Sequence, residues 1–187
     1  MSSEHTMKDS RGGEVSLPEE QRQQVISYLK HQGSKPASDL LVLIQRGAKM
    51  LDDALAGVTE EQARISPAEG EWSISEVLRH VEASALGCAQ LVRALARGEK
   101  GAGGFDGPSM SEGGSLRELR GRVAAAYEEI ERAVAALDAA DLETTANHPF
   151  FGEINCKEWA AFMYVHTRDH VTQIEATKQQ AQTLRSQ

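Results

Sequence analysis

The feature that most constrains the fold is the helical spacing of apolar residues in each of four long segments. It is clearest between residues 116 and 137, where large apolar residues recur every seven positions with smaller ones between them. The residues of this repeat are Leu116, Leu119, Val123, Ala126, Ile130, Ala133 and Leu137. Such spacing is typical of a helix that packs one face against its neighbours in an antiparallel bundle. The polar–apolar alternation of a half-buried strand is absent, so we expect an all-α protein.

Signals for helix ends divide the chain into a short leading helix and four long helices. The leading helix begins near Pro18 and ends before Pro36, which opens a long helix that reaches about residue 58. Each of the other three begins at a Ser or Asn that precedes a Glu by three residues, the signature of a capping box. These pairs are Ser73 with Glu76, Ser115 with Glu118, and Asn155 with Glu158. The predicted fold is a four-helix bundle with a short extra N-terminal helix.

The distribution of polar residues and glycines predicts the limits of one domain. Residues 1–16 are polar, small and interrupted by glycines, so we predict a disordered tail there. Residues 17–182 then form the domain, and residues 183–187 form a frayed C-terminus. Within the domain, residues 98–114 contain seven of the sixteen glycines, which predicts a flexible loop.

Charge and composition exclude several classes of function. The 28 acidic residues exceed the 20 Lys and Arg residues, and the net charge of −8 argues against binding of nucleic acid. No apolar run approaches the roughly 20 residues that a membrane span requires. The N-terminal residues lack the apolar segment of a signal peptide, so we expect a cytoplasmic protein with no membrane partner. Its two cysteines, Cys88 and Cys156, are expected to be reduced thiols.

Three histidines are candidates for a metal site. His166 and His170 are four residues apart on a predicted helix, so their rings lie on the same face, about 6 Å apart along the axis. That face also carries Phe162 and Met163 and should point into the bundle. His80, on the second long helix, could meet the pair there. Three imidazoles from two helices would leave a coordination position open for water or substrate.

Other interpretations of these residues remain open. The histidines could instead be core residues that are hydrogen-bonded to neighbours. Glu76 could line the same cavity as a base or an extra ligand, although its capping role is the simpler explanation. Gln173 returns to the face of His166 and could orient a substrate, or it could be a polar residue at the end of the buried stripe. Thr167 stands where a metalloprotease of the zincin type has its catalytic glutamate, which argues against that class.

Three segments of the chain resemble motifs of the DinB-like metal-binding four-helix bundle family. Residues 70–80 (GEWSISEVLRH) resemble the family's entry to the second helix, and residues 166–174 (HTRDHVTQI) are similar to its closing segment. Between them, residues 148–154 (HPFFGEI), followed by Glu158 and Trp159, look like its "HPxFG" turn. The resemblance covers roughly residues 36–181, with the segments in the family's order. It does not include the leading helix.

This resemblance implies that His80, His166 and His170 bind one divalent ion, usually zinc or nickel. Some family members are similar to transferases that use low-molecular-weight thiols such as bacillithiol or mycothiol, and others are described only as metal-dependent hydrolases. The leading hypothesis is therefore a metal-dependent transferase that joins a thiol to a small-molecule electrophile, or a related hydrolase. The alternatives are a non-catalytic metal-binding or stress-response protein and a plain bundle. Dimers are common in the family, so a homodimer is expected.

Overall fold

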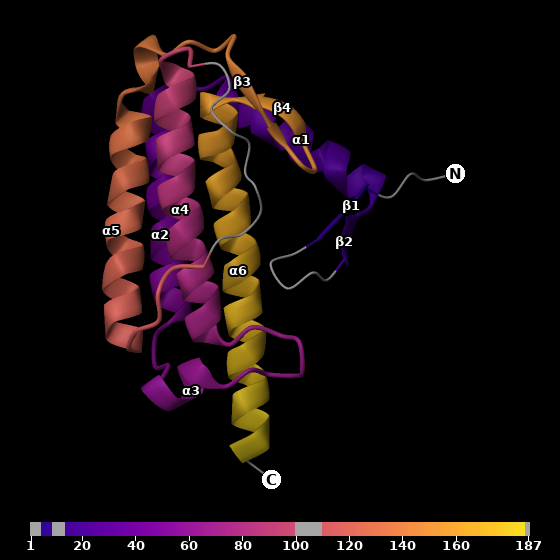
Figure 1. Ribbon diagram of the computed structural model, residues 1–187, viewed down its shortest axis with the longest axis vertical. Coiled ribbons are helices and arrows are strands. Elements are labelled where there is room, and N and C mark those ends of the chain that lie inside the picture. The colour runs from indigo at the N-terminus through magenta and orange to yellow at the C-terminus, as the bar shows by residue number, and fades with distance from the viewer. Residues whose placement is uncertain (1–4, 9–13, 100–109, 186–187) are drawn as a thin grey trace.

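The computed structural model describes residues 5–8, 14–99 and 110–185 and shows a bundle of four long helices lying side by side (Figure 1). These helices are α2 (Ala37–Ala54), α4 (Ile74–Ala96), α5 (Leu116–Ala135) and α6 (Cys156–Arg185). The prediction of a four-helix bundle is confirmed. No described helix combines the length and apolar character needed to cross a membrane.

The predicted capping pairs are present at the starts of three long helices. The hydroxyl oxygens of Ser73 and Ser115 each accept the backbone N–H three residues on, and the Glu at that position accepts the N–H of the serine. Asn155 and Glu158 make the same reciprocal bonds at α6, at 3.1 and 3.0 Å. A fourth capping box, formed by Thr59 and Gln62, starts a short helix, α3 (Glu60–Arg64), that the sequence analysis missed. Each box satisfies backbone donors that would otherwise lack partners.

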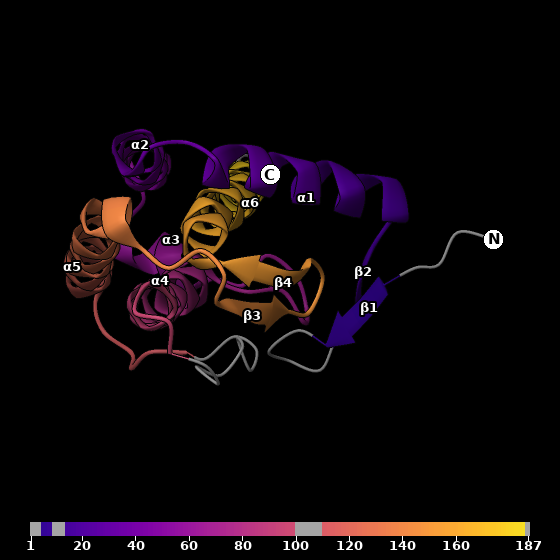
Figure 2. The same ribbon diagram turned by 90° about the horizontal axis from the view of Figure 1, so that it is seen from above.

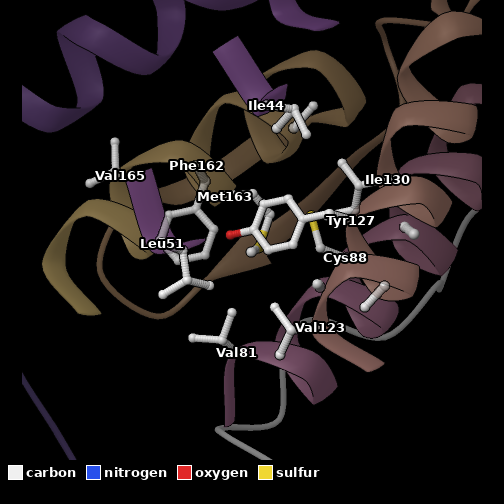
Figure 3. Packing of buried hydrophobic residues seen from close by; sticks show 14 of the residues in the cluster. Ile44, Leu51, Val81, Cys88, Val123, Tyr127, Ile130, Phe162, Met163 and Val165 are labelled. Atoms are coloured by element: carbon white, nitrogen blue, oxygen red, sulfur yellow. The ribbon is translucent and has the colours of Figure 1, made fainter. Parts of the chain in front are cut away.

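The bundle core consists of the apolar faces of the four long helices (Figure 3). All seven residues of the repeat between 116 and 137 are buried, as their spacing predicts. The core also contains a hydrogen-bonded pair of hydroxyl groups, those of Thr167 and Tyr127. Thr167 of α6 donates its hydroxyl to the Met163 carbonyl at 2.6 Å, and its oxygen is hydrogen-bonded to the buried Tyr127 hydroxyl of α5. This pair satisfies the polar atoms that would otherwise be costly to bury.

Two short β-hairpins accompany the helices, and the alternation of polar and apolar residues did not predict them. Strands β3 (Thr145–His148) and β4 (Gly152–Asn155) pair antiparallel just before α6. Strands β1 (His5–Lys8) and β2 (Glu14–Leu17) pair in the same way, within a segment that we predict to be a disordered tail. Four-residue strands are held by backbone hydrogen bonds and are too short to display a clear alternation of polar and apolar residues.

The leading helix α1 (Glu19–Gly33) lies outside the bundle and extends from α6 on the same side as the β3–β4 hairpin (Figure 2). The Arg22 guanidinium donates to the Phe150 carbonyl of the hairpin at 3.2 Å. At its other end, Gly33 packs so closely that an added Cβ would lie 2.8 Å from Cγ of Glu158. The helix is thus fixed near both of its ends.

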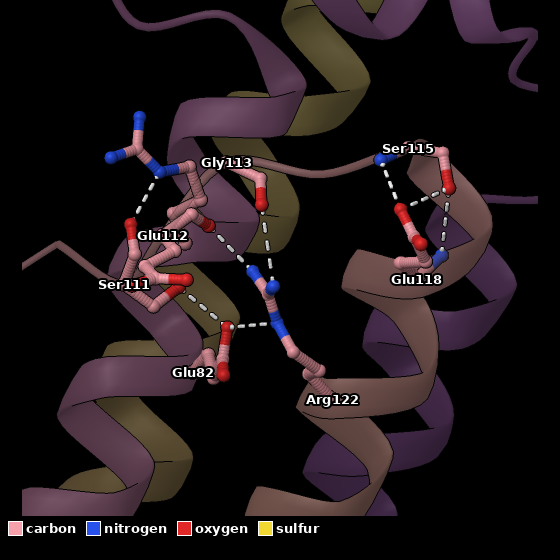
Figure 4. A network of polar contacts seen from close by, with 8 residues as sticks. Glu82, Ser111, Glu112, Gly113, Ser115, Glu118 and Arg122 are labelled. Carbon is pink, nitrogen blue, oxygen red and sulfur yellow. Dashed lines mark hydrogen bonds and ion pairs between the residues drawn. The ribbon is translucent and has the colours of Figure 1, made fainter.

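Hydrogen bonds hold the described end of the predicted flexible loop to α4 and α5 (Figure 4). Ser111 donates its hydroxyl to the buried Glu82 carboxylate at 2.5 Å, and its carbonyl accepts from Arg79 at 2.6 Å. Arg122 of α5 donates to the same Glu82 carboxylate at 3.0 Å and to the Glu112 carbonyl at 2.6 Å. Residues 100–109, the centre of that predicted loop, lie outside the described residues.

Candidate metal centre

The three predicted histidines come together between α4 and α6. His80 Nε2 lies 2.9 Å from His166 Nε2, which in turn lies 3.2 Å from His170 Nε2. Within the described residues, these three form a group whose candidate ligand atoms all lie within 4.8 Å of one another. The spacing of four residues places His166 and His170 on one helical face, and the packing of α4 on α6 brings His80 to them.

The arrangement of the three nitrogens fits a divalent ion. In a tetrahedral zinc site the metal–nitrogen bonds are about 2.0–2.1 Å, so ligand nitrogens lie about 3.4 Å apart. The observed separations of 2.9 and 3.2 Å are close to this value. Three imidazole nitrogens are also a donor set that zinc and nickel accept. The residues present therefore fit such a metal.

Burial keeps the α6 histidines in the form that binds metals. It lowers the pKa of His166 well below its usual value, and the nearby His170 and His80 lower it further. Burial also lowers the pKa of His170, although the hydrogen bond to Gln173 opposes that effect. Near neutral pH these rings are uncharged, which leaves a lone pair on each ring for a cation.

Polar side chains lie beside two of the rings, and Gln173 orients one of them. His170 Nδ1 lies 3.0 Å from Gln173 Oε1, and a proton on Nδ1 donated to this oxygen leaves the Nε2 lone pair directed at the other histidines. Gln173 thus reaches the site, as predicted from its position on the helix. Ser84, one turn after His80 on α4, has its hydroxyl 3.4 Å from His80 Nε2. Sequence reasoning gave Ser84 no role at the site.

Trp72 covers the site from the loop before α4. The Trp72 ring centroid lies 4.9 Å from that of His80, and it stacks on His170 at 6.1 Å with an interplanar angle of 15°. The sequence analysis placed Trp72 in a family motif but did not predict this contact, which depends on the path of the loop.

The remaining candidates lie away from the three nitrogens. The Glu76 carboxylate accepts the backbone N–H and the hydroxyl of Ser73, both at 2.8 Å, which is its capping role. Cys88 and Cys156 are buried free thiols, and burial raises the pKa of Cys88 to about 12. A thiol with such a pKa does not ionise near neutral pH, which argues against Cys88 as a nucleophile.

A cavity of about 770 Å³ opens beside the histidines. Its walls come from the end of β2, α1, the loop before α4, His80 of α4, the β3–β4 hairpin and α6. Its size is within the range of sites for small molecules. Its apolar side chains are Leu17, Val25, Trp72, Pro149, Phe150, Phe151, Phe162 and Val165. Its polar side chains other than histidines are Gln21, Gln24, Glu71, Arg168, Asp169 and Gln173. Although the leading helix is absent from the resemblance, it forms part of this wall.

A fourth histidine, His148 of the hairpin, also lines the cavity. It is only 4% exposed, and its Nδ1 accepts the backbone N–H of Phe150 at 3.2 Å. Burial lowers the pKa of His148 to about 4, so the ring is neutral at physiological pH. The turn of the hairpin packs Phe151 on His148 with ring centroids 4.5 Å apart. Only the hairpin fold reveals this contact.

The fold agrees with comparisons to known proteins. The model of the DinB superfamily matches residues 43–174, well over half of the chain. The chain therefore belongs to the DinB superfamily.

Among individual proteins, the chain is similar to the uncharacterized protein YuaE of Bacillus subtilis (strain 168). The two are 24% identical over 147 residues, which are 67% of this chain and 88% of YuaE. It is also similar to the crystal structure of TT2238, a four-helix bundle protein, with a TM-score of 0.59 and 24% identity. That match covers 75% of this chain and 98% of TT2238, and it supports the fold.

Proposed function

We propose that His80, His166 and His170 bind one divalent ion, zinc or nickel, and that the protein uses it to transfer a low-molecular-weight thiol to an electrophile. The observation that carries this proposal is the convergence of three Nε2 atoms beside a cavity large enough for a small molecule. Three protein ligands are the number in catalytic zinc sites, which keep a further position for a reactant. A closed structural site would use four protein ligands.

The metal would supply one chemical effect, the lowering of the pKa of a coordinating thiol to give a nucleophile near neutral pH. The protein's own residues do the rest. Gln173 fixes the orientation of His170, and Trp72 and Phe162 cover the imidazoles and restrict access of water. The apolar side chains of the cavity would hold the electrophile next to the metal.

A metal-dependent hydrolase is the second candidate. Such an enzyme needs a base to accept the proton of the attacking water. In the described part of the chain, the carboxylates that line the cavity are those of Glu71 and Asp169. Asp169 is on the helix of His166 and His170, although its side chain points about 100° away from that of His170, and it is the candidate that the variant below tests. A non-catalytic metal-binding protein would not require the adjoining cavity.

Metal content, measured by mass spectrometry on untagged protein, tests the site. We expect about one equivalent of zinc or nickel in the wild type and its loss in His166→Ala. His31→Ala is the matched control, because His31 lies exposed at the end of α1. Absence of metal from the wild type after reconstitution with either ion would contradict the proposal, as would equal loss in both variants.

Cobalt-substituted protein separates thiol transfer from hydrolysis. A thiol that coordinates cobalt produces a thiolate-to-metal absorption band, so titration with 2-mercaptoethanol reports whether a thiol reaches the ion. We expect this band in the wild type and not in His166→Ala. Absence of the band in cobalt-loaded wild type would count against the transferase, and slower ester hydrolysis by Asp169→Asn would then support the hydrolase.

A further inference from the structure

The cavity contains a hydrogen-bond donor that the metal site does not use. A neutral imidazole has one N–H group, and a nitrogen that accepts a hydrogen bond cannot carry that proton. Because His148 Nδ1 accepts the N–H of Phe150, the proton of the neutral ring is on Nε2. Among the described residues, no hydrogen-bond partner of this Nε2–H is found, although the ring is 96% buried and lines the cavity.

Aromatic rings surround this donor and connect it to the metal site. Phe151 stacks on the His148 ring at 22°, and Phe162 meets it edge-on with centroids 4.4 Å apart. The same Phe162 ring lies 5.6 Å from the ring of His166. The donor is thus separated from a proposed metal ligand by a single aromatic ring. In such apolar surroundings a hydrogen bond is stronger than in water.

Helix α1 and strand β2, which precedes it, form one further wall of the cavity. Leu17 and Val25 contribute apolar surface, and the bond from Arg22 to the Phe150 carbonyl attaches α1 to the hairpin that carries His148. The one cationic side chain among the cavity residues of the described chain is Arg168, which lies 3.6 Å from the Asp169 carboxylate. This balance of charge favours a neutral ligand over a carboxylate.

We propose that the hairpin, α1 and Phe162 form the subsite of the electrophile, and that its ligand is an aromatic or branched apolar molecule with a neutral oxygen that accepts from His148 Nε2–H. A ketone, an ester or an amide has such an oxygen. The role as the electrophile's subsite rests on the proposed function, whereas the binding of this ligand class does not. His148 is a positioning residue here, since it holds the ligand and not the metal.

Binding of 4-fluoroacetophenone, followed by ¹⁹F NMR on metal-loaded and metal-free protein, tests this inference. Its matched probe is 1-ethyl-4-fluorobenzene, which has the same ring and no accepting oxygen. His148→Asn retains an oxygen that can accept the Phe150 N–H in an Asx turn, but it lacks the distal donor. His148→Gln places an amide N–H near the position of Nε2 and so retains the donor.

We expect the wild type to bind the ketone more tightly than the hydrocarbon. His148→Asn should weaken ketone binding about fivefold, the effect of one net hydrogen bond, and leave hydrocarbon binding unchanged. His148→Gln should recover most of the lost affinity. Equal ketone binding by wild type and His148→Asn would overturn the inference, as would failure of both probes to bind. Because metal content is measured separately, a protein without metal that still binds the ketone would refute the proposed function alone.

Discussion

The burial of His148 makes a quantitative prediction about stability and pH. Its pKa is about 4 in the folded protein and 6.5 in an unfolded chain. The unfolded state therefore binds a proton first as the pH falls, so folding stability declines below pH 6.5 and the loss is complete near the folded pKa. The complete loss is about 3 kcal/mol, and about 2.5 kcal/mol of it has occurred at about pH 4.5.

His148→Asn removes this titration and retains an acceptor for the Phe150 N–H. We expect the wild type to lose about 2.5 kcal/mol more stability than the variant between about pH 7.5 and about pH 4.5. Urea unfolding followed by circular dichroism, with a chelator present, measures this difference. The difference in stability corresponds to a shift of about 1 M in the urea concentration at the midpoint of unfolding. The other buried histidines are present in both proteins, and the variant removes only their coupling to His148, which lowers the pKa of His166.

His31→Asn is the control, since it removes an exposed histidine and should lose as much stability as the wild type on acidification. If wild type and His148→Asn lost the same stability, His148 would not be held neutral by burial. The structural account of the hairpin would then be wrong.

Three further predictions concern the site, α1 and the thiols. Binding of nickel or copper should quench tryptophan fluorescence, because the Trp72 ring lies 4.9 Å from that of His80. Trp72→Phe should abolish most of this quenching. Unchanged quenching in the variant would place the ion elsewhere. Gly33→Ala should destabilise the protein by about 1–3 kcal/mol in urea unfolding, because its Cβ would lie 2.8 Å from Cγ of Glu158; unchanged stability would contradict the close packing of α1. Cys88 should react with a thiol reagent at about pH 8 only in denaturant, because burial raises its pKa to about 12. Mass spectrometry of its peptides identifies the modified cysteine. Rapid reaction of Cys88 in the folded protein would refute this burial.

The helices were predictable because they depend on local signals. The capping pairs at Ser73, Ser115 and Asn155 each satisfy backbone donors within four residues, and the seven-residue repeat specifies which face of α5 is buried. The predicted end of α2 is wrong by four residues, since the helix ends at Ala54 and not near residue 58. There, Gly57 has a positive φ of 73° and turns the chain towards α3.

The part of the metal site that lies on α6 was predictable, because the spacing of residues along one helix determines which side chains share a face. The positions of His166, His170 and Gln173 on one face result from helical rotation alone, and their contacts agree with that prediction. The approach of His80 depends on the packing of α4 on α6, which the predicted bundle made possible and the family resemblance made specific. The identity of the metal, the homodimer and the cytoplasmic location stay predictions.

The rest of the cavity could not be predicted, because its walls come from segments without helical periodicity. His148 reaches the cavity through a four-residue strand, and Trp72 reaches the histidines through a loop. The hairpin is stabilised by backbone pairing and by contacts such as Arg22 with Phe150, which join residues far apart in the sequence. Such contacts leave little trace in residue spacing.

X-ray absorption spectroscopy at the metal edge of zinc- or nickel-loaded protein counts the imidazoles bound to the ion and so tests the three-histidine site itself. We expect three imidazole nitrogens at about 2.0–2.1 Å for zinc, with two remaining in His80→Ala. A metal bound by fewer than two imidazoles, or a spectrum unchanged in His80→Ala, would contradict a site built from His80, His166 and His170.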